Sequence, residues 1–170
     1  MSASGLPAFE RIPAPQPGAL IFLCDHASNA LPPAYGTLGL PEAEFKRHIA
    51  SDIGAAPLTR ALAAEFAAPA LLGVWSRLLI DLNRGPDDPT LVMKISDGAL
   101  VPGNARIDEA GIAERILHCY APYDAAIDVA VEALRDFMKS RPRPDLNAIY
   151  RYAQLDRVQS VIRPYLEAMT

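Results

Sequence analysis

Four polar side chains fall within five positions, directly after a short apolar run. In the stretch LIFLCDHASN, residues 20–29, the run leads into Asp25, His26, Ser28 and Asn29. A short apolar run that ends in turn-forming residues is typical of a buried strand, and ligands of open α/β sheets bind beyond the carboxyl ends of the strands. The cluster is therefore a candidate ligand site. The alternative is that the other three residues cap a turn and that His26 only packs.

A second histidine, His48, precedes Asp52 by four positions in the stretch HIASDIG. If this stretch is helical throughout, the two side chains share one face of the helix. A histidine and a carboxylate on one face suit a metal ion, or a base with the group that orients it. The alternative is that Asp52 caps the following helix and that His48 lies on its polar side.

Two arginines and an asparagine flank another apolar run, in SRLLIDLNRGP. If this run is a strand, Arg77 precedes it, and Asn83 and Arg84 follow it near one edge of the sheet. Arginine binds carboxylates through planar, paired hydrogen bonds, so two arginines beside an amide suit a small dicarboxylate ligand. The alternative is that one of the arginines forms a structural ion pair with Asp81 or Asp87.

The stretch SDGALVPGN, residues 96–104, contains two glycine turns and is predicted to be a constrained loop. Its polar residues Ser96, Asp97 and Asn104 are candidates to border the same cleft as the arginines. Local turn formation explains these residue types equally well.

Strands and helices alternate along the predicted chain. After an extended, proline-rich lead-in at 1–18, strands are predicted at 20–24, 70–75, 77–82 and 146–152, and helices at 108–139 and 155–169, with a kink near Pro122 and an interruption at Pro164. Two helical pieces are expected within 39–69, because Gly54 and Pro57 favour a break near Ser51 and Asp52. This order predicts an α/β fold of three layers, with a mostly parallel sheet flanked by helices, in a single domain over 1–170.

Composition restricts the class of protein. The chain has 170 residues, 51% of them hydrophobic, and a net charge of −4, which argues against nucleic acid or an anionic membrane as a partner. No apolar run approaches the roughly 18 residues of a membrane span, and no secretory leader is evident. Cys24 and Cys119 suit small buried side chains in a reducing compartment, so a cytoplasmic location is expected. The oligomeric state stays open.

Several of these motifs, in this order, resemble the N-formylglutamate amidohydrolase family. The motifs are CDHASN, HIASDIGA, SRLLIDLNR, SDG, PGN and YAPY, over residues 20–124. The resemblance implies a zinc-exopeptidase-like (phosphorylase/hydrolase-like) fold. It also implies hydrolysis of N-formyl-L-glutamate, or a related N-acyl amino acid, to formate and L-glutamate in histidine degradation. The expected cofactor is Zn²⁺ or another divalent metal, and the expected partner is a small anionic substrate.

The resemblance also implies roles for individual residues. The family is similar to metallocarboxypeptidases and aspartoacylases, whose first strand is followed by a His-x-x-Glu metal pair, here His26 and Asn29. The expected metal ligands are His26, Asn29 and His48, with Asp25 and Asp52 as competitors. Arg77 is expected to stabilise the oxyanion, and Asp52 to take part in catalysis. Asn83 and Arg84 are expected to bind the substrate carboxylate, with Ser96, Asp97 and Asn104 nearby.

The sequence departs from the family pattern in its last part. Tyr150 stands where a family histidine is expected to complete the metal site, and the family's PYH is Pro122, Tyr123 and Asp124 here. Tyrosine is a poor zinc ligand near neutral pH. Residues 141–170 are therefore expected to be a diverged or truncated end. The alternative function is a catalytically inactive member that binds a small dicarboxylate through an arginine-lined pocket, and a third is a scaffold whose site is unused.

Overall fold

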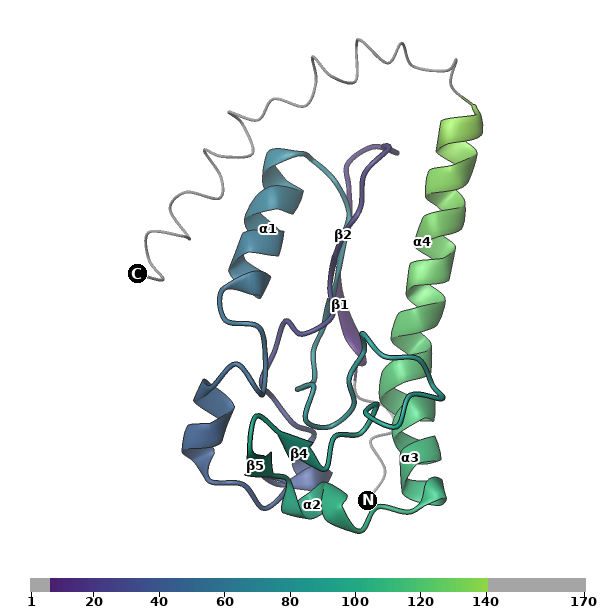
Figure 1. The fold of residues 1–170 in the computed structure, drawn as a ribbon. Coiled ribbons are helices and arrows are strands. Elements are labelled where there is room, and N and C mark those ends of the chain that lie inside the picture. The colour runs from purple at the N-terminus through teal and green to yellow at the C-terminus, as the bar shows by residue number, and fades with distance from the viewer. Residues whose placement is uncertain (1–6, 141–170) are drawn as a thin grey trace.

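A small three-stranded sheet lies between two helices. The structure is a computed structural model, and it describes residues 7–140. The sheet order is β1 (Phe9–Ile12), β3 (Ala70–Gly73) and β2 (Phe22–Cys24). Helix α1 (Ala55–Glu65) lies on one side of the sheet and α4 (Ala121–Lys139) on the other (Figure 1). The chain is thus a mixed α/β protein.

The sheet has one parallel and one antiparallel pair. β2 runs parallel to the central strand β3, with Phe22 opposite Ala70, and β1 runs antiparallel to it, with Phe9 opposite Gly73. All four residues of β3 are buried, as expected for an apolar strand covered on both faces. The predicted strands at 20–24 and 70–75 are present in shorter form. The described residues do not form the predicted mostly parallel sheet. One of the two strand pairs is antiparallel, because the segment predicted as an extended lead-in contains β1.

The predicted break before α1 is present. Gly54 has a φ of +82°, a left-handed conformation that glycine adopts without strain, and α1 starts at the next residue. Pro57 lies in the first turn of α1, where its missing N–H costs no helical hydrogen bond. The first helical piece is reduced to the 3₁₀ turn η2 (Glu42–Lys46).

The predicted strand at 77–82 is wrong, since these residues form turns. Leu78, Leu79 and Ile80 are at most 1% exposed, but Leu78 packs into one apolar cluster and the next two residues into another. The backbone N–H of Asp81 donates to the carbonyl of Leu91 at 2.8 Å, in place of a neighbouring strand. A fully buried turn has the same apolar sequence as a buried strand, so periodicity does not separate the two.

The predicted helix at 108–139 is present and contains a π-helical turn. Asp108 caps α3 (Glu109–Arg115), which continues through the π turn η3 (Ile116–Tyr120) into α4. Pro122 has no N–H to donate to the carbonyl four residues earlier, and the wider turn just before it accommodates that loss. The irregularity predicted at Pro122 is therefore this π turn.

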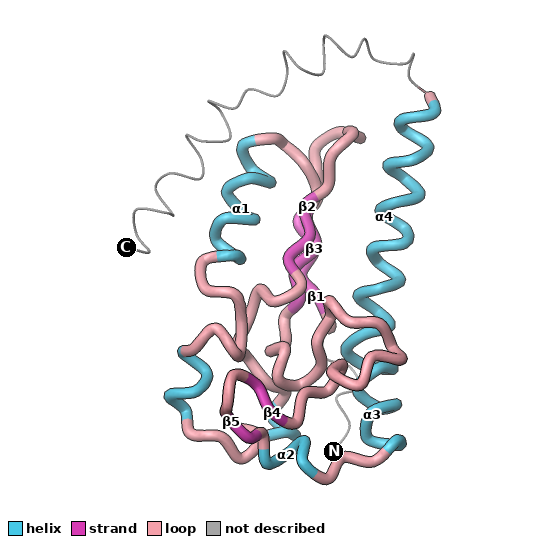
Figure 2. Tube along the Cα trace, in the orientation of Figure 1, coloured by secondary structure: helices cyan, strands magenta, loops and turns pink. Residues whose placement is uncertain are grey.

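Loops and short elements fill the end of the molecule where β2 and β3 finish (Figure 2). The short elements there are η1 (Pro33–Tyr35), β4 (Ile95–Ser96), β5 (Ala99–Leu100) and α2 (Pro102–Ala105). Because β2 and β3 are parallel, the residues that follow both strands meet at this edge. Within 7–140, no helix is long and apolar enough to cross a membrane. The elements predicted at 146–152 and 155–169 lie outside the described residues.

Candidate active site

His26 and Asp81 form a short, buried contact at the carboxyl ends of the strands. His26 follows β2, and its Nε2 lies 2.6 Å from Oδ1 of Asp81. The exposed fraction of the side chain is 7% for His26 and 0% for Asp81. Burial of two polar side chains stabilises the fold only when they satisfy each other, and this contact does so.

Arg77 and Asp52 extend this contact into a network of alternating charge. Nη2 of Arg77 lies 2.9 Å from Asp81 and Nη1 lies 3.4 Å from Asp52. The other oxygen of Asp52 lies 3.4 Å from Nδ1 of His26. These four residues, His26, Asp52, Arg77 and Asp81, are the His26 network. The backbone N–H of Asn83 also donates to Asp81, at 3.0 Å.

The network shifts the pKa of His26 and the pKa of Asp81 in the directions that favour their charged forms. Burial by itself lowers the pKa of His26, but the hydrogen bond and the charge of Asp81 outweigh it, so the pKa is raised above its usual value. Burial by itself raises the pKa of Asp81, but the hydrogen bond and charge of His26, with the Asn83 N–H, lower it below its usual value. Protonated His26 and ionised Asp81 therefore stabilise each other.

Close backbone packing holds the loop that carries His26. A Cβ at Gly73 would collide with the backbone oxygen of Asp25 and would lie 2.6 Å from the side chain of Leu82. Glycine at this position lets β3 approach the loop after β2. The N–H of Asp52 also donates to the carbonyl of His26, at 3.0 Å. His26 and Asp52 are thus joined through both backbone and side chain.

Tyr123 ties α4 to the same loop. Its hydroxyl donates to Oδ1 of Asp25 at 2.7 Å, and the residue is 1% exposed. Burial, with this carboxylate next to it, raises the pKa of Tyr123 well above its usual value. The neutral phenol is therefore a permanent donor to Asp25. Neither Asp81 nor Tyr123 is among the site residues predicted from the sequence.

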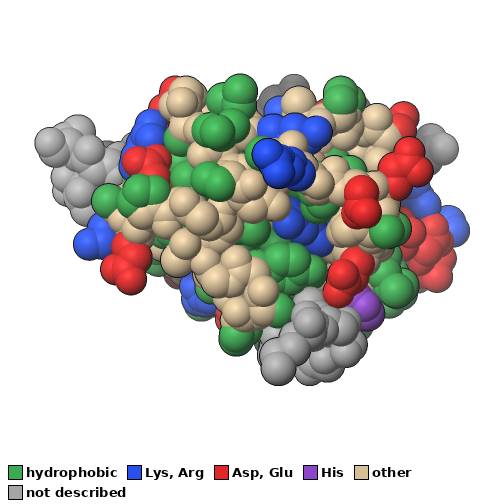
Figure 3. Space-filling model, turned by 90° about the horizontal axis from the view of Figure 1, so that it is seen from below, with side chains coloured by type: hydrophobic (Ala, Val, Ile, Leu, Met, Phe, Trp, Pro, Cys, Tyr) green, Lys and Arg blue, Asp and Glu red, His purple; other side chains and the backbone are tan. Residues whose placement is uncertain are grey.

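A pocket of about 310 Å³ lies against the network. Its polar wall includes Asp25, His26, Asp52 and Asn83, and its apolar wall comes from β2 and α1. Arg77 does not line the pocket, although it contacts Asp52, which does line it. Figure 3 views this end of the molecule, where Lys and Arg side chains lie near the middle of the face.

Three other predicted residues do not line the pocket and have partners outside the His26 network. The amide of Asn29 donates to the carbonyl of Phe45 at 2.7 Å. Nε2 of His48 lies 3.6 Å from Asp97, and both side chains are exposed. The segment containing His48 and Asp52 forms turns, so the shared helical face is not present. Arg84 is half-exposed and lies 3.8 Å from Asp88.

The predicted loop residues Ser96, Asp97 and Asn104 occupy structural positions. Ser96 ends β4, and Asp97 and Gly98, with φ of +44° and +76°, form the tight turn to β5. Asp97 also accepts from Arg47 at 2.7 Å. Asn104 is 0% exposed, and its amide donates to the carbonyls of Leu78 and Met93. Asn104 therefore holds the turn that precedes Asp81.

The described residues by themselves do not fit a catalytic zinc site. Such a site takes three protein ligands. Within 7–140, no group of three His, Cys, Asp or Glu side chains is arranged to hold a metal ion. Nε2 of His26 is already taken by Asp81, which leaves Nδ1 with Asp52 beside it. Tyr150 lies outside the described residues.

Comparisons with known proteins agree with the motifs. The family model of N-formylglutamate amidohydrolase matches residues 18–142. The crystal structure of gene product Atu2144 from Agrobacterium tumefaciens matches with a TM-score of 0.67 and 33% sequence identity, covering 73% of this chain and 50% of that one. The chain thus spans half the length of that structure, and no curated protein matches it. The chain belongs to the N-formylglutamate amidohydrolase family.

Proposed function

We propose that this protein is an amidohydrolase that cleaves N-formyl-L-glutamate, or a related N-acyl amino acid, to formate and L-glutamate. Family membership supports amide hydrolysis. The observation that carries the proposal is the 2.6 Å contact between His26 and Asp81 beside a pocket that His26 itself lines. A buried histidine with a perturbed pKa and a fixed orientation is typical of an acid–base or ligand group.

Asp81 leaves Nδ1 as the reactive nitrogen of His26. Asp81 accepts a hydrogen bond from the Nε2–H group of His26. The neutral imidazole therefore presents its lone pair at Nδ1, toward Asp52. Nδ1 then serves either as the base that accepts a proton from the attacking water or as a metal ligand. Both roles need neutral His26, so we expect activity to rise with pH through the raised pKa of His26.

The remaining predicted residues divide between the reacting carbonyl and the substrate carboxylate. Arg77 is the candidate for the oxyanion, since its guanidinium lies 3.4 Å from Asp52, which lines the pocket. Asn83, which lines the pocket, and Arg84, whose ion pair with Asp88 is long at 3.8 Å, are the candidates for the carboxylate.

Further expectations belong to the same proposal. Zn²⁺ is expected from the family resemblance, and His26 and Asp52 are the described residues that would contribute ligands. A three-layer, zinc-exopeptidase-like fold is expected for the whole protein, and the positions of α1 and α4 on either side of the sheet support it. The net charge of −4 supports a small-molecule substrate over nucleic acid or membrane. The free, buried Cys24 and Cys119 support a reducing, cytoplasmic location.

Formate release from N-formyl-L-glutamate tests the proposal, with added Zn²⁺ and, in parallel, with a chelator. Turnover that the chelator abolishes shows that the reaction needs a metal ion, which the ligand role of His26 requires, and turnover that it leaves intact supports His26 as a base. If folded protein shows no turnover in either condition, the proposed amidohydrolase activity is overturned. Calorimetric titration with N-formyl-L-glutamate then tests the inactive, ligand-binding alternative, which requires that Arg84→Ala weakens binding.

A further inference from the structure

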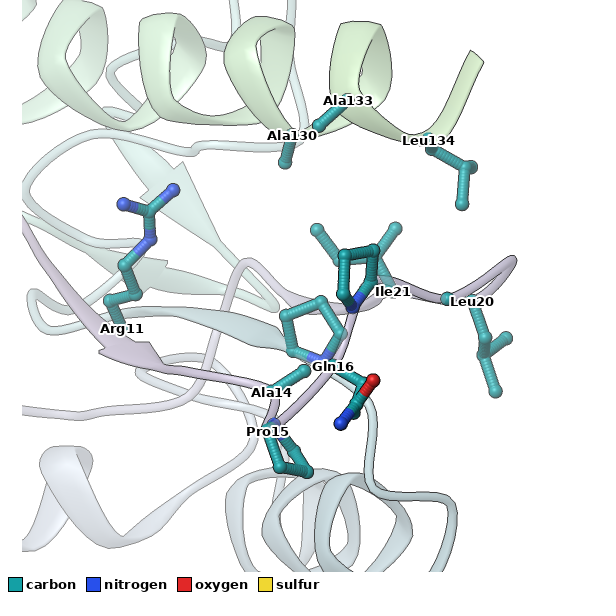
Figure 4. Close-up of a pocket in the computed structure, with 12 residues that line it drawn as sticks. Arg11, Ala14, Pro15, Gln16, Leu20, Ile21, Ala130, Ala133 and Leu134 are labelled. Atoms are coloured by element: carbon teal, nitrogen blue, oxygen red, sulfur yellow. The ribbon is translucent and has the colours of Figure 1, made fainter. Parts of the chain in front are cut away.

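An apolar groove separates the second half of α4 from the loop between β1 and β2. It has a volume of about 330 Å³ and lies away from the His26 network. Ala130, Ala133 and Leu134 line it from α4, and Leu20 and Ile21 line it from the loop, with several prolines (Figure 4). A groove of this composition buries apolar side chains from another segment at little desolvation cost.

The inner face of α4 lacks full cover along this groove. Tyr123 is buried, but Ile127, Ala130 and Leu134, which continue its helical stripe, are only partly buried. The stripe therefore extends past the sheet. A helix with one apolar face gains most of its stability from packing that face, so such a stripe normally has a partner.

The segment that follows α4 has the matching pattern. In the sequence LDRVQSVIRPYLEAM, Leu155, Val158 and Ile162 recur at spacings of three and four before Pro164, and Leu166 follows it. α4 ends at Lys139, five residues after Leu134, which is about 8 Å along a helix axis. The intervening residues are enough to lead the segment back, and a covalent link raises its effective concentration at the groove.

We propose that residues 155–169 pack their apolar stripe into this groove of the same molecule. Charge supports the assignment. Arg11 lines the groove, and within the described part of the chain its guanidinium makes no ion pair. Asp156 and Glu167 each stand next to a residue of the apolar stripe, so either supplies a carboxylate to Arg11.

Disulfide trapping in the full chain tests this placement. Ala133→Cys is combined with Val158→Cys or with Ile162→Cys, and the native Cys24 and Cys119 are both buried. The matched control replaces Ala133→Cys by Glu132→Cys, because the side chain of Glu132 is 61% exposed. We expect an internal disulfide under mild oxidation at least about fivefold faster for the groove pair than for the control. Equal rates, or a disulfide-linked dimer, would overturn the proposal, the dimer indicating a second copy in the groove.

Hydrogen exchange provides a second readout that does not depend on the exact register. Val158→Asp places a charge on the apolar stripe, while Ser160→Asp places it on the opposite side. We expect the first variant to speed amide exchange in residues 127–137 several-fold and the second to leave it unchanged. Unchanged exchange in both variants, from folded protein, would contradict the proposal.

Discussion

His26 and Asp81 are 55 positions apart in the sequence, and their side chains meet at 2.6 Å. The contact exists because the turn at 77–82 folds beneath the loop that follows β2. It makes Asp81, which is fully buried, the group that fixes which nitrogen of His26 faces the pocket. The proposed chemistry depends on this pair more than on any single predicted ligand.

Asp81→Asn is expected to destabilise the protein in a pH-dependent way. Breaking a buried ion pair from one side costs about 3–5 kcal/mol. Because the pKa of His26 is raised in the folded protein, the stability that His26 contributes is fully present below about pH 6.5. This contribution is lost as pH rises through the folded pKa. Because the pKa of Asp81 is lowered in the folded protein, the stability that Asp81 contributes is present above about pH 4. This contribution is lost as pH falls through the folded pKa.

The difference in unfolding free energy between the wild type and Asp81→Asn should therefore be largest between these two values and should narrow as pH rises through the raised pKa of His26. It does not vanish there, because Arg77 still pairs with Asp81 at 2.9 Å. Urea denaturation at pH 5.5 and pH 8.5 measures it. A difference that is the same at both values would contradict a loss of the His26 contribution over this pH range.

Gly73→Ala should destabilise the protein by about 1–3 kcal/mol or more, because overpacking against backbone is hard to relieve. The added methyl group would meet the carbonyl of Asp25 and the side chain of Leu82. Gly18→Ala is the matched control, since a Cβ there meets nothing within 4 Å. Thermal unfolding of both variants decides the matter, and equal midpoints would refute the close approach.

Tyr123→Phe should lower the unfolding free energy by about 1.5–3 kcal/mol, the usual range for a hydrogen bond to a charged group. It removes the hydroxyl that donates to Asp25 at 2.7 Å and leaves the ring in place. Tyr120→Phe is the control, since within residues 7–140 its hydroxyl makes no hydrogen bond. If chemical denaturation gives the same value for both variants, Tyr123 does not hold the loop.

The features of the fold that depend on nearby residues were predicted from the sequence. The strand before His26, the break at Gly54 and the irregularity at Pro122 each follow from residues within a few positions. The turn at 77–82 was missed because three successive buried residues contact two different clusters, which only the tertiary structure decides. β1 was missed because the prolines around it favour an extended, unpaired chain.

The candidate site was predicted by residue type more than by contact. The apolar run before His26 placed it at a strand end, and the family resemblance assigned Arg77 to the same site. The sequence offers Asp81 as an ion-pair partner for an arginine, but its contact with His26 depends on a turn that the same sequence predicts as a strand. The contact between Asp25 and Tyr123 spans 98 positions, and nothing in one sequence pairs them.

Formate release by His26→Ala, compared with wild type and with His118→Ala, tests the central claim most directly. His118 lies in the π turn η3, outside the His26 network and its pocket. We predict that wild type and His118→Ala turn over N-formyl-L-glutamate at similar rates and that His26→Ala is slower by at least about 100-fold, the size of an acid–base contribution. Equal turnover by all three folded proteins would contradict the assignment of the reaction to His26.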